Sequence, residues 1–146
     1  MNCGTCYYHY VFCGVRDIYQ VGDTVSLRFV IGDSDLAAFN GERVHPFYST
    51  FALGRDAEWT CRQFVLNMKE DDEEGIGSFL NIRHKSPAFL GENVTITAQI
   101  TALEGNRIDC SFRVEINERL IAEGEQGQRI LKKSKIDQII QSIKPA

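Results

Sequence analysis

Two stretches of strict alternation constrain the fold of this chain more than any other feature of its sequence. The segments NVTITAQITALEG (93–105) and RIDCSFRVEIN (107–117) each place an apolar side chain at every second position. A period of two is typical of β-strands with one buried face. The turn EGN at 104–106 predicts that the two strands form a hairpin. The predicted inner positions are Val94, Ile96, Ala98, Ile100 and Ala102, followed by Ile108, Cys110, Phe112, Val114 and Ile116.

Further strands are expected on both sides of this pair. Asp23–Ile31 is rich in β-branched and aromatic residues, and RLIAEGEQGQRIL (119–131) follows a second predicted turn, NER. The segment IGSFLNIRHKS (76–86) would place Ser78, Leu80, Ile82 and His84 on one inward face. Residues 32–49 predict an irregular segment with a short helical turn, because Gly, Asp, Asn and Pro recur there. The run KEDDEEG (69–75) predicts a solvated loop.

A helix is predicted from Phe51 to about Met68. At 100° per residue, one continuous arc collects Leu53, Phe64, Ala57, Met68, Cys61, Gly54, Val65 and Phe51. Glu58 is the one charged residue inside that arc, so a carboxylate is expected in an apolar setting. A second, short helix is expected at the C-terminus, where a helical stripe would cover an apolar surface with Ile136, Ile139, Ile140 and Ile143.

The order of these elements predicts an α+β fold, with a curved antiparallel sheet around one long central helix and a short C-terminal helix. At 146 residues the chain fits one domain, which we place at 21–146, after an N-terminal extension at 1–20. Hydrophobic content of 43% and charged content of 25% are ordinary for a soluble globular protein.

Charge and cysteine content exclude several classes of protein. A net charge of −4 argues against nucleic acid and anionic membranes as partners, and no apolar run reaches the roughly 20 residues of a membrane span. No basic residue precedes Arg16, so no secretory signal is expected. Five cysteines without a pairing framework indicate reduced thiols in the cytoplasm. Zinc-type donors gather in the extension, but their spacing favours free thiols and no metal: Cys3, Cys6, His9 and Cys13.

The segments TFALGRDAEWTC (50–61) and GSFLNIRHKSPAFLGENVTITAQITALEGNRIDCSFRVE (77–115) carry a resemblance to a known family. They resemble the hotdog-fold thioesterases related to fluoroacetyl-CoA thioesterase, over roughly residues 21–131. The resemblance implies catalytic roles for Thr50, Glu58 and His84, and a glycine near the acyl group at Gly77. It also implies a homodimer with the site at the subunit interface. The family's acyl-pocket residues do not match, so the resemblance carries no fluoroacetyl specificity.

Each of these residues also has a plainer interpretation. Glu58 could pair with Arg55 or Arg62, one helical turn away on either side. His84 could be a core histidine, and Thr50 or Ser49 could cap the helix. Gly77 could simply open a strand. The basic side chains that could meet the phosphates of CoA, or stay solvated, are Arg83, Lys85, Arg129, Lys132 and Lys133.

The expected function is hydrolysis of an acyl-CoA thioester to a free acid and CoA, without a metal or redox cofactor. Glu58 would act as general base or as the nucleophile that forms a mixed anhydride. Eight residues of continuous helix would separate Thr50 from Glu58 by about 12 Å. Both can serve one site only if Thr50 precedes the helix and folds back or if two subunits share the site, and we favour the shared site. An acyl-CoA-binding sensor without turnover is the alternative. An enoyl-CoA hydratase is disfavoured, because no His lies between Thr50 and Met68.

Overall fold

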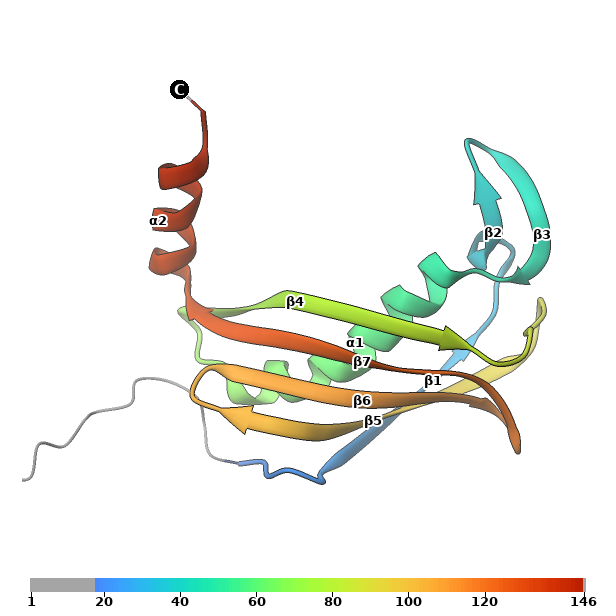
Figure 1. Cartoon of the computed structure of the whole chain (residues 1–146), viewed down its shortest axis with the longest axis horizontal. Helices are drawn as coiled ribbons and strands as arrows, with labels where there is room; N and C mark the ends of the chain where they lie inside the picture. Colours follow the sequence, from blue (N-terminus) through green and yellow to red (C-terminus); the bar gives the residue numbers. More distant parts are fainter. Residues whose placement is uncertain (1–17, 146) are drawn as a thin grey trace, which may run out of the picture.

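The computed structural model describes residues 18–145, and one sheet packed on one long helix makes up most of it (Figure 1). The strands β1, β5, β6, β7 and β4 form an antiparallel sheet in that spatial order. The predicted α+β architecture, with a central helix and a short C-terminal one, is confirmed. The elements are β1 (Thr24–Val30), the 3-10 turn η1 (Asp33–Asp35), β2 (Leu36–Phe39), β3 (Glu42–Tyr48), α1 (Thr50–Met68), β4 (Glu73–His84), β5 (Asn93–Glu104), β6 (Arg107–Ile116), β7 (Arg119–Lys132) and α2 (Lys133–Ile143).

The core lies between α1 and the inner face of the sheet. The alternation predicted for β5 and β6 is confirmed from Val94 to Ile100 and from Ile108 to Ile116, where the inner side chains are buried. A register shift between Ile100 and Ala102 ends the pattern in β5. The helix contributes Leu53, Ala57, Cys61, Phe64, Val65 and Met68 to the same cluster. Burial of two facing apolar surfaces therefore fixes how α1 lies on the sheet.

The segment 32–49 is more regular than its composition predicts. The helical turn is present as η1, but β2 and β3 form a separate two-stranded hairpin, so the prediction of an irregular segment is wrong. The turn residues Asn40 and Gly41 have φ values of 52° and 82°. An Asn-Gly pair favours this two-residue turn, because both central positions need positive φ. The hairpin rises beyond the sheet at the start of α1 (Figure 1).

The acidic run after α1 is not simply a solvated loop. Glu73 begins β4 and is 3% exposed. Its carboxylate accepts a hydrogen bond from the backbone N–H of Glu70 at 2.9 Å and lies 3.2 Å from the Lys132 ammonium. Glu74 pairs with Arg62 at 2.6 Å. Two of these carboxylates thus hold the α1–β4 connection and the end of β7 together.

The C-terminal helix forms as predicted, but residues 18–145 leave most of its apolar face exposed. None of its residues is buried, and Ile140 and Ile143 are 52% and 74% exposed. Figure 1 shows α2 standing away from the sheet at the end of β7. Among residues 18–145, the isoleucine stripe therefore does not bury itself against an apolar surface as expected.

The predicted extension at 1–20, including Cys3, Cys6, His9 and Cys13, falls almost wholly outside the described residues. Within residues 18–145, no helix is long and apolar enough to cross a membrane. The same residues contain no cluster of three or more His, Cys, Asp or Glu side chains that could hold a metal ion.

Candidate active site

The strand β4 lies against α1 and carries a β-bulge near its middle. The register with β7 shifts between Gly77 and Phe79. Before the bulge, a Cβ atom added to Gly77 would lie 3.2 Å from the Glu58 carboxylate. After it, Leu80 and Ile82 face Gly54 of α1. The bulge thus allows both halves of β4 to face the helix, and Ser78, predicted on the same face as Leu80, falls within the bulge instead.

Thr50 and His84 meet at the start of α1. Ser49 is the N-cap, and its hydroxyl accepts a hydrogen bond from the backbone N–H of Ala52 at 3.0 Å. Because Ser49 fills that role, the Thr50 hydroxyl is available to another partner. Thr50 Oγ1 lies 2.8 Å from His84 Nε2, across 34 residues of sequence. Both side chains are exposed in the single subunit.

Glu58 lies two turns further along α1, beside Gly77. Its side chain is exposed in the single subunit, so it is not enclosed by the core as its place on the helical arc predicted. The contact with Gly77 leaves no space for a side chain at that position without moving the carboxylate. The structure therefore brings the predicted residues together as two pairs, Thr50 with His84 and Glu58 with Gly77.

The plain interpretation of Glu58 is an ion pair with Arg55 or Arg62, but within residues 18–145 both arginines bind other carboxylates. Arg55 bonds to Asp35 and Asp56 at 2.9 and 2.8 Å. Arg62 bonds to Glu74. Among residues 18–145, the Glu58 carboxylate makes neither a hydrogen bond nor an ion pair. An acceptor of this kind can take a proton from an incoming molecule without first losing a partner.

An open cavity is bordered by both Thr50 and Glu58. It has a volume of about 1210 Å³ and is bordered by α1, by β4 and by the tip of the β2–β3 hairpin. Thr50 also borders a smaller cavity of about 390 Å³, which His84 lines. The apolar wall of the larger cavity is made by Phe39, Phe51, Trp59, Leu80 and Ile82. Thr50 thus stands between the two cavities, with Glu58 on the wall of the larger one.

Sequence reasoning missed a buried polar network behind this cavity. Asp56 is 4% exposed and accepts hydrogen bonds from the Tyr48 hydroxyl at 2.6 Å and from Arg55 at 2.8 Å. Burial and then the bond to the Asp56 carboxylate raise the pKa of Tyr48. The signal in the sequence was the spacing of Asp56 from Ala52 and Leu53, which places it on the buried face of α1. The charged residue inside the apolar face is therefore Asp56 and not Glu58.

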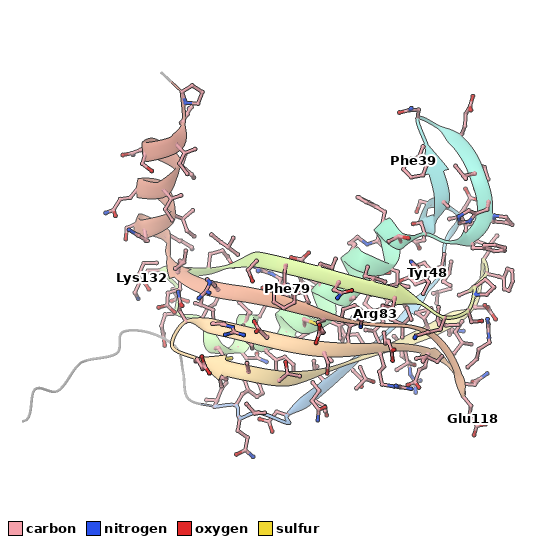
Figure 2. The ribbon with its side chains drawn as sticks, in the orientation of Figure 1. Phe39, Tyr48, Phe79, Arg83, Glu118 and Lys132 are labelled. Carbon is pink, nitrogen blue, oxygen red and sulfur yellow. The ribbon has the colours of Figure 1, made fainter. Side chains whose placement is uncertain are left out.

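The two arginines expected near CoA lie elsewhere. Arg83 alternates with Ile82 and His84 along β4 and is exposed on the opposite face of the sheet (Figure 2). Arg129 is exposed between the buried Gln128 and Ile130 of β7, and it donates to the Asn106 side chain at 3.5 Å. Neither arginine lines the two cavities, so in one subunit they do not join the other candidate residues.

Comparison with known proteins places this geometry in a family. The model of the family named FlK, fluoroacetyl-CoA-specific thioesterase, matches residues 31–134, which is most of the chain. The chain belongs to this family. No curated protein gave a significant match.

Solved structures agree with the assignment to the fluoroacetyl-CoA-specific thioesterase family. A hypothetical protein of Thermus thermophilus, a thioesterase superfamily member, is 29% identical, with a TM-score of 0.80 over 86% of this chain and 93% of that one. The fluoroacetyl-CoA thioesterase FlK itself is 19% identical, with a TM-score of 0.79 over 88% and 100%. A hot-dog-like protein from Thermanaerovibrio acidaminovorans is also 19% identical, with a TM-score of 0.80 over 88% and 95%. The hotdog fold is thereby established.

Proposed function

We propose that this protein is an acyl-CoA thioesterase that uses Thr50, Glu58 and His84 at a site formed between two subunits. The observation that carries the proposal is the pairing of the Thr50 hydroxyl with the His84 imidazole at 2.8 Å, beside an apolar cavity. The same cavity exposes the Glu58 carboxylate, which has no partner among residues 18–145. An apolar cavity with a few polar groups suits an acyl chain ending in a reactive carbonyl.

The chemistry requires water to replace the CoA sulfur at the acyl carbon. Glu58 either removes a proton from that water or attacks the carbonyl itself, giving a mixed anhydride that water then cleaves. In both routes the C–S bond breaks, and the CoA thiolate leaves and takes up a proton. The hydrogen-bonded Thr50–His84 pair would orient the thioester oxygen or supply that proton.

A second subunit is part of the proposal because one helix separates the two pairs. Thr50 and Glu58 are eight residues apart on α1, which is about 12 Å along its axis. A thioester carbonyl cannot contact both side chains of the same helix at that separation. We therefore expect a homodimer in which Glu58 of one subunit faces the Thr50–His84 pair of the other.

The expected location is the cytoplasm. Cys61 and Cys110 are buried free thiols, and the hydrogen bond to Cys110 together with burial raises the pKa of Cys61. Unpaired cysteines within a core are usual in a reducing compartment. Arg83 and Arg129 lie on the outer face of the sheet, so they would contact CoA only if its nucleotide reaches around the sheet from the active site.

The test is hydrolysis of a panel of short, long, branched and aryl acyl-CoAs, followed by loss of the thioester absorbance. Glu58→Gln and His84→Asn should each lower kcat by about 100-fold or more while the proteins remain folded. Thr50→Val should lower the rate more than Thr50→Ser, which keeps the hydroxyl. Glu118→Gln, at the distant β6–β7 turn (Figure 2), is the matched carboxylate control.

Two results would contradict the proposal. Full activity in Glu58→Gln would show that the Glu58 carboxylate takes no part in the reaction. Tight binding of an acyl-CoA by the wild-type protein, with no turnover of any substrate, would instead identify a sensor. After single-turnover hydrolysis in ¹⁸O-water, label on Glu58 would identify the anhydride route, because general-base hydrolysis places the label only in the product acid.

A further inference from the structure

The helix α2 is held in a fixed direction at one corner of the sheet. The backbone N–H of Lys133 donates to the carbonyl of Asp72 at 2.8 Å, and the Lys133 ammonium donates to the carbonyl of Asp71 at 2.8 Å. Lys132, at the base of the helix (Figure 2), pairs with Asp72 and Glu73. These bonds attach α2 to the start of β4, where its isoleucine face remains uncovered by residues 18–145.

The strand β4 ends the sheet and leaves one edge without a partner strand among the described residues. Figure 1 shows that α2 and the β2–β3 hairpin both rise beyond this edge, at opposite ends of it. The start of β4 lies next to α2. The end of β4 carries His84, bonded to Thr50 at the base of the hairpin.

If a second copy pairs with this edge in antiparallel fashion, the start of β4 in one copy lies beside the end of β4 in the other. Two-fold symmetry about the middle of β4 sets Glu73 of one copy opposite His84 of the other. The helix α2 then lies beside the second copy's Thr50–His84 pair. The exposed apolar side chains at that end are Phe51, Phe89 and Leu90, which are 84%, 44% and 57% exposed.

We propose that α2 of each subunit packs its isoleucine face on the other subunit, over Phe51 and the loop after β4, and thereby closes the other subunit's active site. The proposal rests on the homodimer of the proposed function and adds a specific occupant for α2. It gives the site a wall made by Ile136, Ile139, Ile140 and Ile143 of the second chain. The length and bulk of acyl chain that fits would then depend on this helix.

Anionic lipid is a poorer occupant for the same face. A helix on a membrane surface needs free access from one side, whereas α2 stands beside the free edge of a twelve-residue strand. The chain also has a net charge of −4, which repels anionic lipid. A second copy covers the strand edge and the helix face together.

The test places the photo-crosslinking residue p-benzoylphenylalanine at position 140 of the full chain, in a mixture of ¹⁴N- and ¹⁵N-labelled protein. We expect mixed-isotope crosslinks from position 140 to the tryptic peptides 44–55 and 86–107 of the other chain. The matched control carries the same residue at position 138, on the polar face of α2, and should give few such crosslinks. No substrate is needed for this measurement.

A kinetic pair completes the experiment. Ile140→Glu should lower kcat/KM for the best substrate about tenfold, as expected when one buried isoleucine contact is lost. Gln138→Glu adds the same charge on the opposite face and should change it little.

Several outcomes would overturn the inference. One is a dimer that gives no crosslinks from position 140. Another is crosslinks that stay within one chain or reach only residues 1–16. A third is binding of the protein to anionic vesicles that Ile140→Glu abolishes. The inter-chain crosslinks together with no hydrolysis of any acyl-CoA would leave the inference standing and contradict the thioesterase proposal instead.

Discussion

Asp56 and Glu58 lie two positions apart on α1 and occupy opposite environments. Asp56 is buried and accepts hydrogen bonds from Tyr48 and Arg55, whereas Glu58 borders the open cavity without a donor from residues 18–145. A buried carboxylate with two donors stabilises the fold, and its loss leaves those donors unpaired. A carboxylate without donors contributes little to stability and is free to react. The fold should therefore depend on Asp56 much more than on Glu58.

This division predicts separate effects on stability. Asp56→Asn should lower the free energy of unfolding by about 1–3 kcal/mol, because the Tyr48 and Arg55 donors lose a charged acceptor. Glu58→Gln should change it by less than about 0.5 kcal/mol. Urea unfolding followed by circular dichroism measures both. Equal destabilisation by the two substitutions would contradict the distinction.

Tyr48 predicts a pH dependence of stability. Burial and the bond to Asp56 raise its pKa in the folded state above the ordinary value of 10.0. The unfolded chain therefore loses the tyrosine proton first, and the stabilisation that is complete below pH 10 declines above it. The decline should be about 1.4 kcal/mol per pH unit for one proton. Urea unfolding between pH 9 and 11 should show a steeper loss in the wild type than in Tyr48→Phe, and equal slopes would contradict the prediction.

The substitution Gly77→Ala should impair catalysis without impairing folding. The Cβ of Gly77→Ala would lie 3.2 Å from Glu58 Oε1, the mobile end of a side chain, so the carboxylate must shift by a few tenths of an ångström. We expect kcat to fall about tenfold or more while the urea midpoint hardly changes. Gly75→Ala is the contrast, because its Cβ would lie 2.6 Å from Val65 and should destabilise the fold. Unchanged kcat in Gly77→Ala would separate this glycine from the site.

At the level of elements, the periodicity of apolar residues predicts those helices and strands that bury one face in the core. The strands β5 and β6 and the helix α1 follow from spacing, because each buries one face over most of its length. The Thr50–His84 bond could not be predicted from spacing, since it joins residues 34 positions apart through the packing of α1 on β4. The sequence indicated Thr50 and His84 as site residues only through the resemblance to a known family. The missed hairpin is a different case, because its Asn40–Gly41 signal was present in the sequence.

The hairpin turn predicts a local change in stability. Gly41 has φ of 82°, which an alanine adopts only with strain. Gly41→Ala should therefore destabilise the β2–β3 hairpin by about 1 kcal/mol. Hydrogen exchange of the amides at 36–48 should become faster, while those of β5 and β6 keep their protection. Gly32→Ala is the control, because φ there is −91°. Unchanged exchange in Gly41→Ala would show that the hairpin does not depend on this turn.

At the scale of the whole molecule, exposed apolar side chains of the single subunit gather around one cavity. Phe51 and Trp59 of α1 and Leu80 of β4 are 84%, 48% and 43% exposed, and all three border one cavity beside the free edge of β4. Apolar surface gathered in this way is typical of a binding groove or of an interface with another protein. Edge pairing of β4 with a second copy would cover it and remove the exposed strand edge at the same time.

Trp59 allows this assembly to be followed directly, because it is the one tryptophan of the chain. In a dimer that covers α1, the indole leaves water, so its emission should shift to shorter wavelength and acrylamide should quench it less. Both signals should revert on dilution at the concentration where light scattering shows the dimer dissociating, and specific activity should fall along the same curve. Leu66→Glu, at an exposed apolar position of α1, should move all three curves to higher concentration, whereas Glu118→Gln should not. A monomer that keeps full activity, with unchanged Trp59 emission, would show that one subunit holds a complete site and would remove the reason for placing Glu58 opposite another subunit's Thr50.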